Sequence, residues 1–537
     1  MNKVSVTARL LLVALLGILQ KCYETVYSVI HFVLAVVYWG RGKQVPPITN
    51  ELILKSATKL AQEIREGKLK SEDVMKAYIA RIVEVDPIIN ATVERRFADA
   101  LKEAREADAL IASGIYTKQQ LAEEKPLLGV PLSVKVLLTV KGFRSTAASL
   151  LFKDVKAAED APTVAIMKNA GAIVLATTNS AEMGMNFETN NKAHGKTSHP
   201  YDTSRTSGGS SGGESALISA GGSIIGLGND MLGSIRVPCH FTGLFGHKPT
   251  RGLVSADGCF PVPDPKIQSF IYTGPMCRYA EDLVTTMSVL TSQNEKPVKF
   301  GKQVNFSKLK LFYLLSEDVP LSFPPTEEYQ EAIKKVISYF QTTYGVNAKE
   351  VKLPILRSTN MITLHSLLSG VDDVAKVLTA GKKDINKFTE LLKLFIGSST
   401  LTLGPVVAMS LGKFPLWYRK SKVPYYKKLA QEVDEQFDKL LDEQSVLIMP
   451  TFPFSAPYHN EIPVLLPSTW YTSVFNVLGL PSTQCPLGLN KQGLPFGIQI
   501  VSRRNNDPLT IACAVELEKV YGGWVPLGNK LSVRTKC

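Results

Sequence analysis

The residues best suited to chemistry in this chain are serines embedded in a glycine-rich segment. Between Ser207 and Thr250 the sequence carries eleven glycines and seven serines. Glycine tolerates the positive φ angles and close backbone approach that such a loop requires. Loops of this kind cradle an anion on backbone N–H groups or hold a nucleophile against an oxyanion hole. A phosphate loop would end in Gly-Lys-Ser/Thr, which is absent here. The segment therefore favours an oxyanion-type site, without choosing among its serines.

A flexible Gly/Ser linker is the alternative for this segment. Linkers of that type lack apolar side chains, whereas apolar residues at 216–218, 224, 225 and 227 run through it. The pattern therefore favours a folded loop.

A serine nucleophile needs a base, and no histidine is suitably placed. No Gly-x-Ser-x-Gly elbow is followed by a plausible histidine, so a Ser-His-carboxylate site is disfavoured. Lys135 ends a short β-like run, Leu128–Lys135, upstream of the serines. A buried lysine can act as a base because desolvation disfavours its ammonium form. Most lysines are solvated, however, so Lys135 taken alone carries little weight.

The composition is that of a large globular protein with a moderate positive charge. The chain has 537 residues and a formal net charge of +13. No Arg/Lys-rich run with interleaved aromatic residues suggests base readout, so a nucleic-acid partner is not expected. Seven scattered cysteines without a CxxC pair predict free thiols in a reducing compartment. The histidines do not cluster, so we do not expect a metal site. No cofactor is expected either.

The N-terminal segment, residues 1–43, is the most apolar terminus. Leu10–Leu19 carries no polar side chain, and Val26–Trp39 is largely apolar and precedes two basic residues. A cleaved signal peptide is disfavoured because no small-x-small cleavage site follows, and a transmembrane helix needs roughly 20 continuous apolar residues. The segment therefore predicts an uncleaved membrane anchor, either one helix or a hairpin in one leaflet. Its aromatic and basic end suits a lipid interface.

The remaining chain, residues 44–537, alternates helical and strand-like patterns and is predicted to form one domain. The expected elements are a helix capped by Ser71, a helix from Phe97, a helix at 163–169, strands at 172–176, 446–449 and 496–501, and a last helix with Asp507 as N-cap. This alternation predicts an α/β fold with a mixed sheet.

Residues 392–428 combine an apolar stretch with aromatic and basic side chains. Leu392–Leu411 is interrupted by Lys393 and a short Gly-Ser-Ser turn, and Phe414, Trp417 and several tyrosines and lysines follow. Two interpretations stay open: a buried core helix, and a cap that dips into a membrane, since such a mixture suits a headgroup layer.

Several motifs taken together resemble the amidase signature family. They are Gly-Gly-Ser-Ser-Gly-Gly at 208–213, the run Gly228–Pro238, Gly-His-Lys-Pro-Thr at 246–250, and Gly129–Lys135, which resembles that family's lysine strand. Within the family the chain looks most like the animal fatty-acid amide hydrolases, on residues 245–249, 274–283 and 484–490. The resemblance covers nearly the whole chain beyond the N-terminal segment.

The resemblance implies a central mixed, twisted β-sheet covered by helices, and a Ser-Ser-Lys triad. Ser234 would be the acyl-enzyme nucleophile, Ser210 the bridging serine that follows a cis peptide bond, and Lys135 the base. A proton would pass from Ser234 through Ser210 to Lys135 and then return to the departing amine. Without that proton the amine is a very poor leaving group.

The resemblance also implies supporting roles around the triad. Backbone N–H groups would form the oxyanion hole at Met231, Leu232, Gly233 and Ser234. Ser211 would hydrogen-bond the lysine, and Arg236 would pair with a carboxylate such as Asp230. Gly184 would contact the substrate beside residues 183–187, which would line an acyl channel unless they only pack in the core.

Three residues depart from the family pattern. Asn229 stands where Thr or Ser is usual, Leu232 where glycine is usual, and Val136 where an acidic residue is common. A Cβ at Leu232 would be poorly tolerated if φ were positive there. None of the three removes a catalytic side chain.

The leading hypothesis is a membrane-associated serine hydrolase that cleaves long-chain fatty acyl amides to a fatty acid and an amine. One alternative is an amidase or esterase for other hydrophobic amides, such as N-acyl amino acids. Another is a catalytically impaired lipid-binding homologue, if Leu232 distorts the oxyanion hole. The expected partners are a lipid-like amide and a membrane, at the cytoplasmic face of the endoplasmic reticulum or a lipid droplet. The resemblance also suggests a homodimer.

Overall fold

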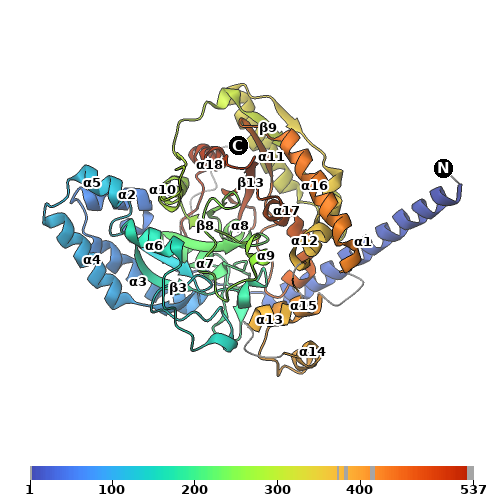
Figure 1. Cartoon of the computed structure of the whole chain (residues 1–537), viewed down its shortest axis with the longest axis horizontal. Helices are drawn as coiled ribbons and strands as arrows, with labels where there is room; N and C mark the ends of the chain where they lie inside the picture. The colour runs from blue at the N-terminus through green and yellow to red at the C-terminus, as the bar shows by residue number, and fades with distance from the viewer. Residues whose placement is uncertain (1–2, 370, 372–373, 380–384, 412–417, 529–537) are drawn as a thin grey trace.

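The computed structural model describes residues 3–369, 371, 374–379, 385–411 and 418–528 (Figure 1). Within this part of the chain one mixed β-sheet has eleven strands. They are β1 (Thr92–Arg95), β2 (Pro131–Lys135), β3 (Ile173–Thr178), β6 (Ile225–Asp230), β7 (Phe245–Lys248), β8 (Tyr272–Cys277), β9 (Lys310–Tyr313), β10 (Ala348–Glu350), β11 (Ser445–Pro450), β12 (Ser482–Leu489) and β13 (Pro495–Ser502). A separate two-stranded sheet pairs β4 (Asn190–Asn191) with β5 (Gly195–Lys196).

The strand order in the large sheet is β1-β3-β2-β6-β8-β7-β12-β13-β11-β9-β10. Strands β3, β2 and β6 are parallel to one another, the β6-β8-β7-β12-β13-β11 pairings are antiparallel, and β11, β9 and β10 are again parallel. Every residue of β2, β3 and β6 is buried, as expected for parallel strands covered on both faces. The predicted α/β fold with a mixed sheet is confirmed.

Helices surround this sheet. They are α1 (Lys3–Tyr38), α2 (Ala57–Arg65), α3 (Ser71–Ile89), α4 (Phe97–Ala112), α5 (Lys118–Glu124), α6 (Pro162–Asn169), α7 (Gly212–Ser219), α8 (Arg236–Thr242), α9 (Pro265–Gln268), α10 (Ala280–Leu290), α11 (Glu327–Tyr344), α12 (Thr359–Leu368), α13 (Val374–Thr379), α14 (Lys387–Phe395), α15 (Leu403–Leu411), α16 (Val423–Leu440), α17 (Trp470–Leu478) and α18 (Asp507–Tyr521). Helix α7 packs against β6, α10 against β8, and α18 against β12 and β13.

Two predicted helix caps are wrong, because both side chains form hydrogen bonds with residues outside their helices. Ser71 is the first residue of α3 rather than its cap, and its hydroxyl donates to the carbonyl oxygen of Gly129 at 2.9 Å. Asp507 is the first residue of α18, which Asn506 precedes as the cap residue. The Asp507 carboxylate instead accepts the backbone N–H of Thr250 at 2.7 Å. Both helices form at the predicted places, but long-range contacts decide the use of these two polar groups.

The apolar N-terminal segment forms one continuous helix, α1, rather than a hairpin. No helix in the described part of the chain combines the length and the apolar character needed to cross a membrane. One face of α1 is attached to the body. Gln20 hydrogen-bonds the backbone of Leu321 and Ser322, the Tyr27 ring lies 4.6 Å from that of Phe323, and Tyr38 stacks on Tyr458.

Residues 392–411 form two helices of different character, joined by a turn. On α15, Val406 and Met409 are buried, which agrees with the core interpretation. On α14 and just beyond it, Phe388, Leu392, Phe395 and Ile396 are exposed, as the cap interpretation requires. Phe414 and Trp417 lie outside the described residues.

Candidate active site

The site lies where two neighbouring parallel strands end. Strand β2 ends at Lys135 and β6 ends at Asp230, and Val134 is paired with Leu227 across them. In open α/β sheets, ligands bind beyond the carboxyl ends of such strands. The glycine- and serine-rich segment therefore returns to the end of β2, although 75 residues separate Lys135 from Ser210.

Lys135 is completely buried, and its amine faces a serine. Its Nζ lies 2.7 Å from the Oγ of Ser210. Burial lowers the pKa of Lys135 from 10.5 to about 7, although Cys259, Asp230 and Glu214 nearby act in the opposite direction. A lysine with this pKa is substantially neutral at physiological pH, so it can accept a proton.

Ser210 is held in place through its backbone. The Gly209–Ser210 peptide bond is cis, as the resemblance implied. The carbonyl oxygen of Ser210 accepts the hydroxyl of Ser180 at 2.9 Å and the backbone N–H of Ala181 at 3.1 Å. The N–H of Ser211 donates to the carbonyl oxygen of Ser234 at 3.3 Å, which ties the two serine-bearing segments together.

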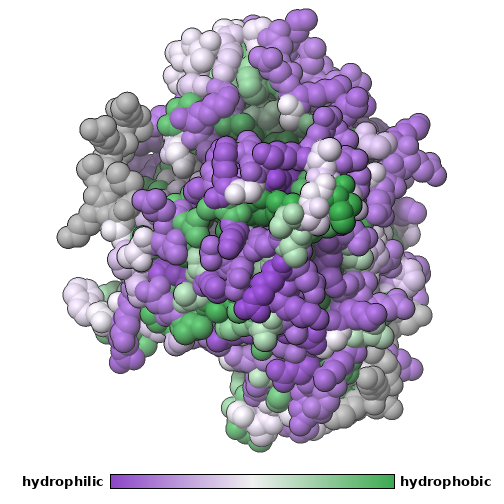
Figure 2. All heavy atoms as spheres, turned by 90° about the vertical axis from the view of Figure 1, so that its left-hand side faces the viewer, coloured by the Kyte–Doolittle hydropathy of each residue, from purple (hydrophilic) through white to green (hydrophobic). Residues whose placement is uncertain are grey.

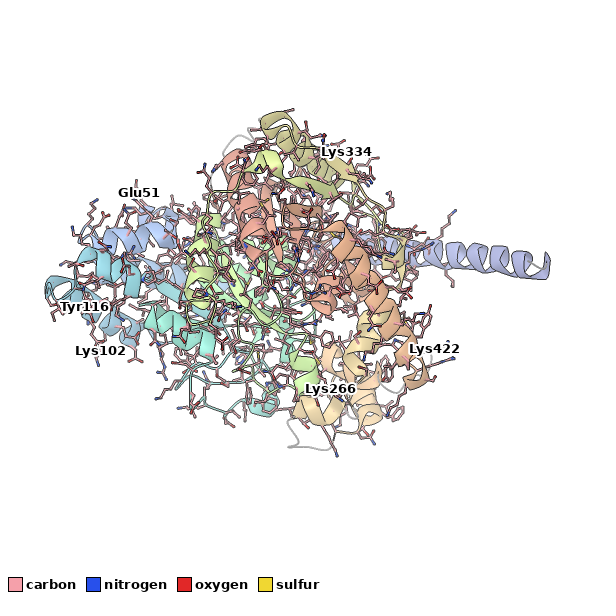
Figure 3. All side chains as sticks on the ribbon, turned by 45° about the horizontal axis from the view of Figure 1, so that its top comes forward. Glu51, Lys102, Tyr116, Lys266, Lys334 and Lys422 are labelled. Atoms are coloured by element: carbon pink, nitrogen blue, oxygen red, sulfur yellow. The ribbon has the colours of Figure 1, made fainter. Side chains whose placement is uncertain are left out.

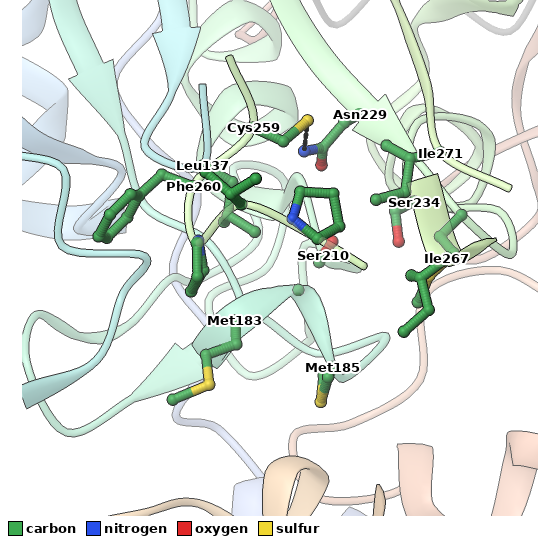
Figure 4. A pocket seen from close by; sticks show the side chains of 15 residues that line it. Leu137, Met183, Met185, Ser210, Asn229, Ser234, Cys259, Phe260, Ile267 and Ile271 are labelled. Carbon is green, nitrogen blue, oxygen red and sulfur yellow. Dashed lines mark hydrogen bonds between the residues drawn. The ribbon is translucent and has the colours of Figure 1, made fainter. Parts of the chain in front are cut away.

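Ser210 and Ser234 open onto one pocket (Figure 4). Its lining consists of Leu137, Met183, Gly184, Met185, Ser210, Asn229, Met231, Ser234, Cys259, Phe260, Pro261, Val262, Pro263, Ile267 and Ile271. The mixture of many apolar groups with a few polar ones is typical of small-molecule sites. Met183 and Met185 line this pocket and also pack in a buried cluster with Phe152 and Leu401, so they are both pocket wall and core.

The backbone that follows β6 presents N–H groups beside Ser234. Among the described residues, no hydrogen-bond acceptor is found for the N–H groups of Met231, Leu232 and Ser234. The N–H of Gly233 is already donated to Oδ1 of Asp230 at 2.7 Å. Three of the four N–H groups predicted for an oxyanion hole are therefore available in this conformation.

Position 233 requires glycine, whereas position 232 tolerates a side chain. Gly233 has a φ of +133°, and a Cβ there would lie 2.3 Å from Oγ1 of Thr472. Leu232 is not among the residues with positive φ, so its Cβ causes no backbone strain of the kind considered above. Its side chain packs instead against a buried cluster that includes Val237 and Phe241.

A buried ion pair anchors this loop. Arg236 and Asp230 are both fully buried, and Nε and Nη2 of Arg236 donate to the two carboxylate oxygens at 3.1 Å each. Burial alone would raise the pKa of Asp230, but the Arg236 guanidinium and hydrogen bonds from Asn476 lower it to about 2. The predicted pairing of Arg236 with Asp230 is present.

The predicted hydrogen bond from Ser211 to Lys135 is not found among the described residues. The Ser211 hydroxyl donates instead to the carbonyl oxygen of Asn229 at 3.4 Å. Asn229 itself faces the lysine, with Oδ1 2.5 Å from Nζ. This contact was missed, although Asn229 stood out as an unusual residue beside Asp230. Gly184, with a φ of +74°, lies in the pocket wall, where an added Cβ would be 3.5 Å from Oγ of Ser210.

Comparison with known proteins agrees with this geometry. The family profile described as Amidase matches residues 73–511. The chain is 39% identical over 489 residues to fatty-acid amide hydrolase 2-A of Danio rerio, which covers 90% of this chain and 91% of that protein. It is also 39% identical over 493 residues to fatty-acid amide hydrolase 2 of Homo sapiens, with 90% and 92% covered.

Solved structures share the fold. A fatty acid amide hydrolase superposes with a TM-score of 0.71 at 21% identity, over 88% of this chain and 86% of that one. A 6-aminohexanoate cyclic dimer hydrolase gives a TM-score of 0.69 at 23% identity, over 88% and 98%. Together with the profile and the two sequence relatives, these similarities show that the chain belongs to the amidase signature family and is an amide-hydrolysing enzyme.

Proposed function

We propose that this enzyme hydrolyses long-chain fatty acyl amides at a membrane surface, through an acyl intermediate on Ser234. The observation that carries the chemistry is the fully buried amine of Lys135, 2.7 Å from Ser210, in a site whose second serine is Ser234. The fatty acyl part is supported by the apolar pocket and by the names of the two 39% identical relatives.

The proposed mechanism is a two-serine proton relay. Neutral Lys135 takes the hydroxyl proton of Ser210 while Ser210 takes that of Ser234, whose Oγ forms a bond to the substrate carbonyl carbon. The N–H groups of Met231, Leu232 and Ser234 stabilise the resulting oxyanion, and losing one such donor typically costs about 10²–10³ in rate. The relay then returns the proton to the amide nitrogen, the C–N bond breaks, and water cleaves the acyl-Ser234 ester by the same route.

The pocket favours an amide with an uncharged head group. None of the residues that line the described pocket is arginine or lysine, so an N-acyl amino acid would find no cationic partner for its carboxylate there. A carboxylate buried without a partner is strongly disfavoured. The alternative of an impaired lipid-binding protein loses its basis, because Leu232 does not have a positive φ.

Activity-based labelling and hydrolysis test the chemistry together. We expect a fluorophosphonate probe to label the enzyme but not Ser234→Ala, and that variant to lose hydrolysis of an oleoyl ethanolamide. Ser215→Ala is the matched control, because Ser215 is a buried serine of the same glycine-rich segment that does not line the pocket. Equal labelling of Ser234→Ala would refute the nucleophile. Labelling without hydrolysis of any acyl amide, across chain lengths and head groups, would refute the substrate class.

The membrane part of the proposal comes from the outward face of α1. Its exposed apolar side chains are Ile18, Leu19, Val26, Val29, Phe32, Val33, Val36 and Val37, and the exposed Trp39 follows the helix directly. They lie opposite the attached face and recur at helical spacing. Phe32 is 68% exposed and Trp39 is 84% exposed. The surface on the α2–α5 side is, by contrast, mostly hydrophilic (Figure 2).

Basic residues accompany this apolar face. Arg41 and Lys43 follow α1 and are exposed, and Lys422 lies on the side of the body from which α1 projects (Figure 3). A helix with this character binds in the interfacial plane of anionic membranes rather than across them. We propose that the enzyme acts at the cytoplasmic face of the endoplasmic reticulum or a lipid droplet, where its lipid substrates dissolve. We also propose that it is a homodimer, as the resemblance suggests.

Vesicle binding tests the membrane assignment. Phe32→Glu and Val36→Glu should abolish co-sedimentation with phosphatidylcholine–phosphatidylserine vesicles, whereas Ser28→Glu, on the flank of the same helix, should reduce it only slightly. Unchanged binding of the first two variants would refute the role of α1. Fluorescence microscopy of the tagged chain tests the organelle, and light scattering tests the dimer.

A further inference from the structure

Among the described contacts, Asn229 is the residue of β6 whose side chain meets the amine of Lys135. It is the next-to-last residue of that strand and only 7% exposed. Its Oδ1 lies 2.5 Å from Nζ of Lys135, and its own carbonyl oxygen lies 3.4 Å from the same atom. The lysine therefore touches three oxygens, two from Asn229 and one from Ser210.

A second contact fixes which end of the amide faces the lysine. Nδ2 of Asn229 donates to Sγ of Cys259 at 3.7 Å (Figure 4). The orientation of an asparagine amide is assigned from such networks. The reverse orientation would place the NH₂ group against the amine, where its N–H would compete with Ser210 for the lone pair of Lys135.

The arrangement matters because a neutral amine has two N–H bonds and one lone pair. The oxygens of Asn229 accept the two N–H bonds. The third direction, which carries the lone pair, then remains for the hydroxyl proton of Ser210. An amine without these acceptors could rotate about its last bond and turn an N–H toward Ser210 instead.

We propose that Asn229 is a positioning residue of this active site: its amide oxygen, held by Cys259, aims the lone pair of Lys135 at Ser210. The inference rests on the two-serine relay proposed above. An uncharged oxygen is suited to this position because it orients the amine while stabilising the ammonium form much less than a carboxylate would. The ionisable groups around Lys135 are Glu214 on α7, Asp230 on β6 and Cys259 in the segment before α9, and Arg236 already pairs with Asp230.

The test replaces the amide oxygen by a charged one of the same shape. Asn229→Asp should move the acidic limb of kcat/KM to higher pH by about 1–3 units, since a carboxylate this close favours the ammonium form of lysine. Activity lost at pH 7 should return at high pH. Asn229→Ala should lower kcat by about 10–100-fold with little change in KM and no alkaline shift, because only orientation is lost.

A matched control separates position from charge. Asn191→Asp also introduces a carboxylate at a buried asparagine, but Asn191 bonds Asn179 and Ser180 rather than the lysine, so its acidic limb should stay where it is. An unshifted limb in Asn229→Asp, or an unchanged kcat in Asn229→Ala, would overturn the proposal. If thermal melting shows that the aspartate variant does not fold, Cys259→Ala replaces it. That variant should lower kcat about two- to tenfold through the lost amide contact, and an unchanged kcat would count against the proposal.

The rate of fluorophosphonate labelling is measured across the same pH series. This rate reports the reactivity of Ser234 without any assumption about the substrate. A labelling rate that shifts in Asn229→Asp while no acyl amide is hydrolysed would refute the substrate class and support the role of Asn229. Labelling that persists in Ser234→Ala would refute the relay and this inference with it.

Discussion

Two fully buried lysines end neighbouring regions of the same sheet, and only one of the two faces a hydroxyl group. Lys135 ends β2 and meets the hydroxyl of Ser210. Lys248 ends β7, where its Nζ donates to the carbonyl oxygen of Pro249 at 2.8 Å and lies 3.7 Å from the centre of the Tyr272 ring. Burial lowers the pKa of both lysines. Neither a carbonyl nor a ring can give up a proton, so burial alone does not make a base.

The sharpest way to break this comparison is to remove each amine in turn. We expect Lys135→Met to lower kcat/KM by about 10²–10⁴, the usual contribution of a general base, with a similar melting temperature. Lys248→Met should keep kcat/KM within about tenfold, since Lys248 does not line the pocket. Steady-state kinetics and thermal melting check both. Equal losses of activity in the two variants would show that the difference in partners is irrelevant.

Asp230 links the two regions, because it lies near both lysines. Asp230→Asn should lower the free energy of unfolding by about 3–5 kcal/mol, since it leaves the buried guanidinium of Arg236 without its counter-charge. Chemical denaturation measures this loss. A variant as stable as the unchanged protein would mean that the ion pair does not hold the loop.

The pH dependence of kcat/KM distinguishes the roles of the two lysines. With a pKa of about 7 for Lys135, kcat/KM should fall about tenfold per pH unit below 7 and level off above it, because only the neutral amine accepts a proton. Lys248→Met should leave this limb in place. A limb that disappears with Lys248 would reverse the assignment.

Both lysines should make the free energy of unfolding depend on pH in the same direction. Between pH 7 and 10.5, unfolded Lys135 binds a proton that folded Lys135 lacks, so the free energy of unfolding rises with pH across this window. Lys248, whose pKa is also lowered, contributes in the same direction. Replacing either lysine with methionine should flatten the slope, as denaturation at several pH values would measure.

The smallest expected effect is on the Lys248 side. Tyr272→Phe keeps the ring beneath the lysine but removes the hydroxyl. That hydroxyl donates to the carbonyl oxygen of Asn476 at 2.7 Å and accepts Nε–H of Arg251 at 3.2 Å. The loss should be about 1–3 kcal/mol of stability, since two hydrogen bonds are removed, with kcat unchanged. A marked fall in kcat would mean that the surroundings of Lys248 influence catalysis in the pocket.

Local patterns predicted the elements well and their long-range partners poorly. Helical spacing located α3 and α4, and the buried strand after α6 follows from its apolar run. The caps at Ser71 and Asp507 were wrong because Gly129 and Thr250, far away in the sequence, bind those side chains. The attached face of α1 could not be predicted either, since its partners lie some 300 to 440 residues further along the chain.

The site was predictable to the extent that a motif carries it. The resemblance brought Lys135, Ser210 and Ser234 together, and the structure places the lysine against one serine and both serines on one pocket. The contact of Asn229 was missed because this residue departs from the motif. The pairing of β2 with β6, which brings Asn229 to Lys135, is a property of the sheet.

The position of β2 inside the sheet has a consequence for motion. This strand is hydrogen-bonded to β3 on one side and to β6 on the other, so its amide protons should be among the slowest to exchange with solvent. The opposite wall of the pocket, at 259–271, is largely a connection between strands that holds the short helix α9. Lys135 is thus mounted on a strand that is paired on both sides. Under the proposed function, the wall beyond Cys259 can adjust to acyl chains of different shape, whereas Cys259 has to stay in place to hold Asn229.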